Sequence, residues 1–418
     1  MRHAILGLLL IAACASNPDE SPPPPDPSVV RIGLLAPLSG PQTFLGVDFQ
    51  NSAKLAILEI NAAGGINGKP VELLSRDSKT AQPESEVTSI ESVSWLAAAG
   101  VTAIVGPDAS ALVLAVAPTL IENGLPLVSP AASAAQLSTL DDGNLIWRTT
   151  PSDTMQGQAL AGRIARDGKQ TMAIIYRDDA YGAGLATRLA EVFEAGGGHV
   201  LAKVAFPEDK TMDFQPEVGQ ALAAGVPDAI VIVGFALDTA GVLTAIYAGQ
   251  TSPRPALYGC DGNRDPSLFQ NAPKEILLGM RFSSPVSRVD NPNFIHFDQI
   301  YRDALHVAPI GGEFTYDAVY LVALAMVQAG ESTRAAVRDH LGEISRADTA
   351  TPIEIGVGSA EFARAAQNRG SDLDFRGASG GIDFDAAGDI TAATYAIQEI
   401  EEGPDGLAFV DLELLSLP

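Results

Sequence analysis

The pattern of apolar and polar positions predicts alternating strands and helices from residue 30 onward. Residues 31–35 form a short apolar run typical of a buried strand, and residues 47–62 carry Phe49, Ala53 and Ile57 on one face of an expected helix. The first block contains expected strands at 31–35, 71–74, 101–105, 125–128 and 145–148, with helices at 47–62, 83–99 and 111–123. This alternation favours a parallel sheet covered by helices on both faces.

A second block of the same kind follows after a break near residues 148–153. Its expected strands are 171–176, 199–205, 229–233 and 256–258, and its expected helices are 182–195, 216–224 and 238–248. Two such blocks predict an α/β protein with two doubly wound, Rossmann-like lobes. A TIM barrel is the competing α/β architecture, and the internal break argues against it.

The last part of the chain returns to helices, clearest at residues 315–329, and then to expected strands at 381–384 and 394–400. This return predicts that the chain crosses between the lobes more than once and so forms a multi-crossing hinge. We expect residues 30–150 with about 285–345 to form the first lobe, and residues 151–284 with about 376–418 to form the second.

The N-terminal segment is typical of a lipoprotein export signal. Arg2 begins it, a short apolar run follows, and residues 11–14 match the bacterial lipobox, which ends in a cysteine. We therefore expect a signal peptide at residues 1–13 and lipidation at Cys14, although a plain secretory signal with an incidental cysteine is the alternative. The proline-rich residues 14–29 are expected to form an extended tether. The expected location is the cell envelope, facing the periplasm and anchored to the inner or outer membrane.

Composition and charge exclude several classes of function. The 418 residues are 46% hydrophobic and 18% charged, as in ordinary globular proteins. The net charge of −25 disfavours nucleic acid and anionic lipid as partners. The sequence contains no HExxH, CxxC, GxSxG or Walker motif, and no histidines at zinc-ligand spacing. A hydrolase would need a nucleophile–base pair that the sequence does not offer, so we expect a protein without metal, cofactor or enzymatic activity.

Candidate binding residues follow the carboxyl ends of expected strands, where open parallel sheets bind ligands. Ser110 and Ser133 lie in two such junctions, and their hydroxyls together with the free N–H groups of a helix start suit a carboxylate. Simple helix capping is the alternative for both serines. Asp261 follows the strand at 256–258, where it could hold an ammonium group or merely form a turn. A carboxylate site facing an acid suits the zwitterion of an α-amino acid.

Several short segments, in their order along the chain, resemble the branched-chain (Leu/Ile/Val) amino-acid-binding type of periplasmic binding protein. They are residues 37–40, 60–68, 105–107, 126–131, 181–182, 316–320 and 382–385. The resemblance covers nearly all of residues 31–400. It implies the type I periplasmic binding fold, with two Rossmann-like lobes joined by three strands, and delivery of a solute to the permease of an ABC importer.

The resemblance also implies roles for individual residues. Ser110 and Ser133 match the hydroxyl residues that hold the ligand carboxylate, and Ala131 matches a backbone carbonyl that accepts the ammonium. Asp261 matches an acid that binds the same ammonium, one methylene shorter than the glutamate of branched-chain binders. Tyr181 matches an aromatic residue that covers the ligand, with core packing as its alternative role.

The side-chain pocket is less well defined. Phe44 and Leu45 lie in the loop that shapes it in the family, and Phe235 is a further candidate, where the alignment slips by one residue. Asp108 departs from the family, whose branched-chain binders carry an apolar or small residue in this region. A cleft-facing Asp108 favours a polar or cationic ligand, and the alternative is an aspartate that only begins a helix.

Two functions remain open. The first is a lipid-anchored solute-binding protein of an ABC importer that binds an amino acid or a related small zwitterion or carboxylate. The second is a ligand-sensing or regulatory envelope lipoprotein of the same fold that is not coupled to transport. Ala15 follows the cysteine, where no aspartate argues for retention in the inner membrane.

Overall fold

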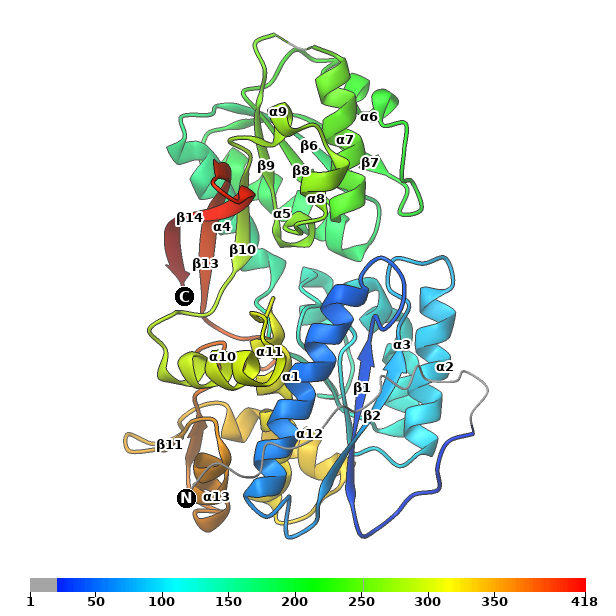
Figure 1. Ribbon diagram of the computed structural model, residues 1–418, viewed down its shortest axis with the longest axis vertical. Coiled ribbons are helices and arrows are strands. Elements are labelled where there is room, and N and C mark those ends of the chain that lie inside the picture. The colour runs from blue at the N-terminus through cyan, green and yellow to red at the C-terminus, as the bar shows by residue number, and fades with distance from the viewer. Residues whose placement is uncertain (1–20, 251) are drawn as a thin grey trace.

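The computed structural model describes residues 21–250 and 252–418, which form two lobes, one above the other in Figure 1. The expected signal peptide at 1–13, the lipidation site Cys14 and the first residues of the tether lie outside the described residues. The end of the tether lies against the first lobe, where Arg31 donates to the Pro24 carbonyl at 2.7 Å. Within the described residues, no helix combines the length and apolar character needed to cross a membrane.

The first lobe is built on a five-stranded parallel sheet of order β2-β1-β3-β4-β5. Its strands are β1 (Val30–Ala36), β2 (Val71–Asp77), β3 (Ala103–Val105), β4 (Leu127–Ser129) and β5 (Ile146–Arg148). The early helices are α1 (Thr43–Ala62), α2 (Ser85–Ala98), α3 (Ser110–Asn123) and the 3₁₀ turn η1 (Ala135–Thr139). The faces of α2 and α3 pack against one side of the sheet, and α1 packs against the other. Strands covered on both sides explain why their sequences are almost continuously apolar.

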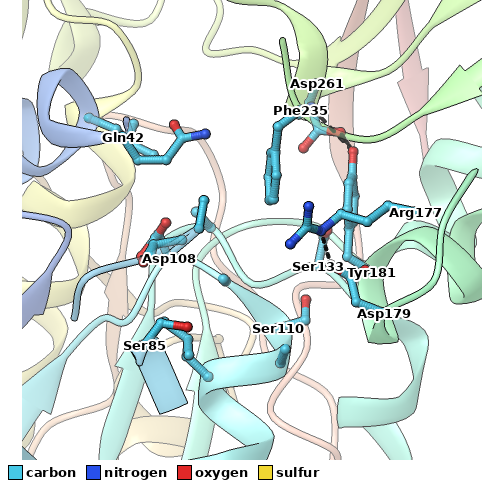
Figure 2. Close-up of a pocket in the computed structure, with 18 of the residues that line it drawn as sticks. Gln42, Ser85, Asp108, Ser110, Ser133, Arg177, Asp179, Tyr181, Phe235 and Asp261 are labelled. Atoms are coloured by element: carbon cyan, nitrogen blue, oxygen red, sulfur yellow. Dashed lines mark hydrogen bonds and ion pairs between the residues drawn. The ribbon is translucent and has the colours of Figure 1, made fainter. Parts of the chain in front are cut away.

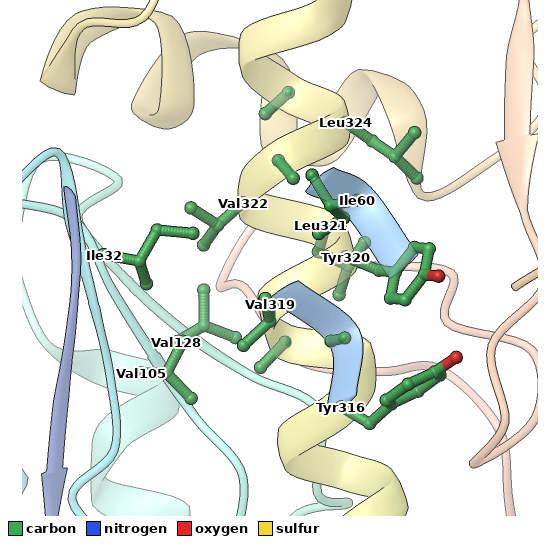
Figure 3. Close-up of a cluster of buried hydrophobic side chains, with 14 of the residues drawn as sticks. Ile32, Ile60, Val105, Val128, Tyr316, Val319, Tyr320, Leu321, Val322 and Leu324 are labelled. Atoms are coloured by element: carbon green, nitrogen blue, oxygen red, sulfur yellow. The ribbon is translucent and has the colours of Figure 1, made fainter. Parts of the chain in front are cut away.

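Later segments of the chain complete the first lobe. They are α10 (Pro292–Leu305), α11 (Gly312–Ala329), α12 (Arg334–Ile344), β11 (Ile353–Ile355), α13 (Ser359–Gln367) and β12 (Leu373–Phe375). Helix α11 is buried on nearly every side because its sequence is apolar all round. Val319 and Val322 face Ile32 and the neighbouring strand residues, whereas Tyr316 lies on the opposite side of the helix (Figure 3). The helix expected at residues 315–329 is confirmed.

The second lobe contains a seven-stranded sheet of order β14-β13-β10-β9-β8-β6-β7. Its strands are β6 (Thr171–Arg177), β7 (His199–Phe206), β8 (Ala229–Val233), β9 (Ala256–Gly259), β10 (Arg281–Pro285), β13 (Ala393–Gly403) and β14 (Gly406–Leu417). Strands β6 to β10 are parallel, and β13 and β14 are antiparallel additions at one edge. The helices are α4 (Asp153–Arg166), α5 (Ala180–Ala195), α6 (Gln215–Ala221), α7 (Ala236–Ala248), η2 (Asp261–Asn263), α8 (Leu268–Asn271) and α9 (Lys274–Leu277). Helices α4 and α5 cover one face, and α6 and α7 cover the other.

Residues 376–392 belong to the first lobe, so their expected assignment to the second lobe is wrong. Ile382, Phe384 and Ile390 are buried in the first-lobe core, and Asp389 forms an ion pair with Arg148 of β5. The chain enters the second lobe for the last time only at β13, so it passes between the lobes three times, after β5, after β10 and before β13. The expected strand at 381–384 is also wrong, because this stretch forms only isolated bridges.

Candidate ligand-binding cleft

A cleft of about 600 Å³ lies where the two lobes meet (Figure 2). The structure places every residue of the predicted ligand set on its walls: Phe44, Leu45, Asp108, Ser110, Ala131, Ser133, Tyr181, Phe235 and Asp261. The first six come from the first lobe and the last three from the second. The carboxyl ends of parallel strands supply most of this wall, as expected for open α/β sheets.

The two serines occupy adjacent loops of the first lobe. Ser110 is the first residue of α3, and its Oγ accepts the Ala134 N–H at 3.0 Å, which joins the loop after β3 to the loop after β4. Ser129 reinforces the junction by donating to the Pro107 carbonyl at 2.6 Å. Neither serine supplies a side-chain cap, since Ala109 is the N-cap of α3 and Ala134 that of η1. The Ser133 hydroxyl also interacts with the buried Asp153 carboxyl. Both serines are almost fully buried at the cleft wall and present hydroxyls beside a helix start.

Asp261 is oriented by neighbours rather than free in a turn. Its Oδ1 lies 2.8 Å from Gln156 Nε2 and 2.8 Å from the Tyr181 hydroxyl. Burial raises the pKa of the Asp261 carboxyl, while these two hydrogen bonds act in the opposite direction. Buried Asp153 lies close enough to influence Asp261, and burial followed by the Asp261 charge raises the pKa of Asp153 well above its usual value. The second lobe thus presents a carboxylate held in place by donors.

Tyr181 has two roles. Its ring packs in the core of the second lobe, and it also stacks on Phe235 with 6.1 Å between ring centroids. Burial raises the pKa of its hydroxyl well above the usual value, so the group remains a donor toward Asp261 or toward the sulfur of Cys260 at 2.9 Å. Cys260 itself is a free, buried thiol. Core packing and contact with the cleft therefore coexist at Tyr181.

Asp108 stands in the loop between β3 and α3 with its side chain at the cleft. Its Oδ1 accepts the Thr80 hydroxyl at 2.7 Å, and Thr80 is linked in turn to Ser78 at 2.8 Å. Only 8% of Asp108 is exposed, and burial raises the pKa of its carboxyl to about 6. Figure 2 shows Asp108 on the side of Gln42, across the cleft from Asp261.

Two arginines that were not predicted from the sequence, Arg177 and Arg264, also line the cleft. Arg177 ends β6, with Nε 2.7 Å from Asp179 and Nη1 2.6 Å from the Glu208 carbonyl. Its guanidinium lies 5.2 Å from the centre of the Phe235 ring and points into the cleft (Figure 2). Arg264 follows η2 and hydrogen-bonds to Gln398. The rule that singled out Asp261, a polar residue at the carboxyl end of a strand, would also have selected Arg177.

Apolar side chains supply another part of the wall. Phe44 and Leu45 come from the first turn of α1, Phe235 precedes α7, and Phe314 lies in the first turn of α11. In the described part of the chain, no group of histidine, cysteine and acidic residues could hold a metal ion. The arrangement suits a small organic molecule whose polar groups contact the strand ends and whose carbon skeleton contacts the aromatic rings.

Comparisons with known proteins agree with this architecture. Residues 29–404 match the family described as periplasmic binding protein. A substrate-binding protein of a chemotactic signal transduction system, BasB of Halobacterium salinarum, is 28% identical over 89% of this chain and 87% of that protein. A Leu/Ile/Val-binding protein, BraC3 of Rhizobium johnstonii, is 34% identical, but the match spans only 43% of this chain and 48% of that protein.

Solved structures share the fold. A leucine-binding protein from Thermotoga maritima superposes with a TM-score of 0.75 at 22% identity, covering 93% of this chain and 99% of that one. The solute-binding protein of an ABC transporter from Rhodopseudomonas palustris, in complex with p-hydroxybenzoic acid, has a TM-score of 0.73 at 19% identity, with 93% and 97% covered. The two-lobed type I fold expected from the sequence is confirmed.

Proposed function

The chain belongs to the periplasmic binding protein family, and we propose that it captures an amino acid or a related small zwitterion or carboxylate between its lobes. Members of this family are solute-binding proteins rather than enzymes. One observation carries the proposal: Ser110 and Ser133 of the first lobe line the same cleft as Asp261 of the second. A dipolar molecule in that cleft would contact hydroxyl donors at its negative end and a carboxylate at its positive end.

The proposed binding mode assigns a task to each wall. The Ser110 and Ser133 hydroxyls and the N–H groups at the start of α3 bind the carboxylate, because a helix N-terminus favours negative charge. The Ala131 carbonyl and Asp261 bind the ammonium, with Asp261 held in place by Gln156. Tyr181, Phe44, Leu45 and Phe235 enclose the carbon skeleton.

Capture requires closure of the two lobes around the ligand. The three passages between the lobes provide a hinge, and a ligand that contacts both walls binds more tightly to the closed arrangement. We propose that the permease of an ABC importer recognises the closed form. A signal peptide at residues 1–13, lipidation at Cys14 and the tether at 14–29 would hold the receptor at the membrane, and this anchoring rests on the sequence alone.

A second candidate is a ligand-sensing receptor that is not coupled to transport. The similarity to a chemotactic substrate-binding protein of Halobacterium salinarum over most of both chains favours it. The two functions share the same capture step and differ in the partner. Deletion of the gene separates them: loss of radiolabelled amino-acid uptake supports transport, and loss of a behavioural response with normal uptake supports sensing.

Ligand binding is the first test. The purified chain would be screened by thermal unfolding against the common amino acids, amides and small aromatic and aliphatic carboxylates, and ligand carried through purification would be identified by mass spectrometry. A ligand at about one hundred times its Kd should stabilise the protein by about 2.7 kcal/mol. Variant Asp261→Asn should abolish the shift for zwitterions. No stabilisation by any compound, together with no co-purified ligand, would contradict the proposal.

A further inference from the structure

The cleft carries a large excess of negative charge. Among the described residues, seven acidic and two basic side chains line it. Arg177 is within ion-pair distance of Asp179, Asp238 and Glu208. Arg264 is hydrogen-bonded to the neutral amide of Gln398, and the charges of Asp411 and Glu313 act on it. The charge of Arg177 is therefore more than balanced by its own neighbours, and a further anionic group from a ligand would have to compete with three carboxylates.

Asp108 is a buried acid of the cleft that has no cation beside it among the described residues. In the part of the chain that the structure describes, the Asp108 carboxyl accepts the Thr80 hydroxyl and the backbone N–H groups of Asp108 and Ala109, and no ion pair forms. The side chain is nevertheless almost fully buried, and the nearby Asp77 charge adds to the cost of ionising it. These neutral donors only partly offset the cost of burying the carboxylate, whose pKa stays raised at about 6, and a cation beside it would offset that cost further. The missing counter-charge points to a group that the ligand supplies.

The position of Asp108 indicates which part of the ligand carries the cationic group that would pair with it. Asp261 lies across the cleft and is the acid proposed for the α-ammonium, so Asp108 faces the opposite end of the molecule, beside Gln42 (Figure 2). Phe44, Leu45 and Phe235 lie among the same walls and would cover a methylene chain. A ligand with an aliphatic side chain would instead press methyl groups against a buried carboxylate when the lobes close.

We infer that Asp108 is a specificity-determining residue that pairs with a cationic side chain, so that the ligand is a basic amino acid such as lysine, ornithine or arginine. This inference rests on the proposed function and specifies its ligand class. Charge-assisted hydrogen bonds from an ammonium or guanidinium to the Asp108 carboxylate would add a counter-charge to the neutral donors that hold it. The acidic cleft would also attract such ligands from solution.

The first test uses matched ligands and the native chain. Isothermal titration at about pH 7.5, where an aspartate with a pKa near 6 is ionised, would compare lysine with norleucine and arginine with citrulline. Citrulline keeps the length and shape of arginine without its charge, and norleucine keeps the four-carbon side chain of lysine without its ammonium group. We expect the cationic member to bind at least about tenfold more tightly. Equal or tighter binding of norleucine and leucine, or preferential binding of glutamate, would overturn the inference and leave the proposed function standing.

The second test uses matched variants. Asp108→Asn should weaken lysine binding at least about tenfold and change norleucine binding less than about threefold. Asp209→Asn is the control, because it removes the same charge from an exposed position on the cleft, and it should leave both affinities within about threefold. Equal losses of lysine affinity in both variants would show that the overall negative charge of the cleft, and not Asp108 in particular, selects the ligand. If Asp108→Asn fails to fold, the ligand pairs decide alone. No binding by any member of the pairs overturns the inference, and the proposed function is contradicted only if the wider screen also finds no ligand.

Discussion

The hydroxyl of Tyr181 lies 2.8 Å from Oδ1 of Asp261, so a residue of the second-lobe core directly orients the carboxylate that faces the cleft. Gln156, from the first helix after the chain enters this lobe, donates to the same oxygen at 2.8 Å. Three elements that are remote in sequence therefore determine where one negative charge is held. The pairing predicts that ligand affinity depends on a hydroxyl that is mostly buried.

Removal of that hydroxyl should weaken binding without unfolding the protein. In Tyr181→Phe the ring keeps its packing and its stacking on Phe235, but Asp261 loses a donor to its ionised form. We expect affinity for a zwitterionic ligand to fall by about 1–2 kcal/mol, or roughly five- to thirtyfold, measured by titration calorimetry. Tyr247→Phe, at an exposed position on α7 away from the cleft, is the control. Unchanged affinity in Tyr181→Phe would show that Asp261 does not contact the ligand.

Ligand affinity should fall in mild acid. Burial raises the pKa of Asp261 above its ordinary value, and only the ionised carboxylate attracts an ammonium group. As the pH falls through the raised pKa, Asp261 gains a proton and affinity declines; above that pKa the affinity is constant. Calorimetric titration from about pH 8 to about pH 4 would measure the curve. For a zwitterion with an uncharged side chain, the decline should disappear in Asp261→Asn, whose affinity is low at every pH.

The unliganded protein should show the opposite trend in stability. Burial raises the pKa of Glu313 to about 7 and that of Asp108 to about 6, so the folded state binds these protons more tightly than the unfolded state. Stability should therefore rise as the pH falls from about 8 to about 5, by a few kcal/mol at most, as measured by urea unfolding. Glu313→Gln keeps an acceptor for the Ser287 hydroxyl and should flatten the slope. A free energy of unfolding that decreases as the pH falls over this interval would contradict the raised pKa values of Glu313 and Asp108.

The buried ion pair of the first lobe should be important for stability. Arg148 is 2% exposed, and Asp389 lies 2.5 Å from its Nε. Asp389→Ala leaves the guanidinium without its carboxylate, and we expect a loss of about 3–5 kcal/mol in urea unfolding. The exposed pair Arg288 and Asp290 is the control, and Asp290→Ala should have no measurable effect. Similar small effects in both variants would show that Arg148 finds other partners.

Closure can be followed by distance measurement. Glu86 and Asp209 are exposed and line the cleft from opposite lobes, so spin labels at Glu86→Cys and Asp209→Cys report the gap between the lobes. A saturating ligand should shorten the distance between the labels. Labels at Glu86→Cys and Ile121→Cys, both in the first lobe, should keep a constant distance. A ligand that binds without changing the first distance would contradict capture by closure.

The sequence was informative where function depends on strand ends. Ser110, Asp108 and Asp261 follow buried apolar runs directly, and parallel strands deliver their carboxyl ends to one edge, so their convergence needed no knowledge of distances. Arg177 obeys the same rule but terminates the strand itself, where it resembles a strand residue. Gln156 reaches Asp261 from a helix, and only the path of the chain between the lobes brings the two together.

The errors in the fold have equally physical causes. Residues 376–392 lack periodicity because side chains hold them: Asp317 accepts the N–H groups of Ala378 and Ser379 at 2.8 and 2.7 Å. No pattern in the sequence predicts that the Asp317 side chain binds this distant segment of backbone. Strand β14 was not expected because it is an edge strand with half-exposed positions, among them Val410, Leu412 and Leu414, and so lacks the contrast between buried and exposed positions that marks an inner strand.

The three passages between the lobes also govern how the molecule must be assembled. Helix α11, the centre of the first-lobe core, is synthesised after all five parallel strands of the second lobe, and β13 follows only at Ala393. Neither lobe is a continuous stretch of chain. Each therefore stays incomplete until late segments of the chain have been synthesised. A nascent chain stopped before Gly312 would present the apolar faces of β3 and β4 to solvent, so both halves must mature late and together.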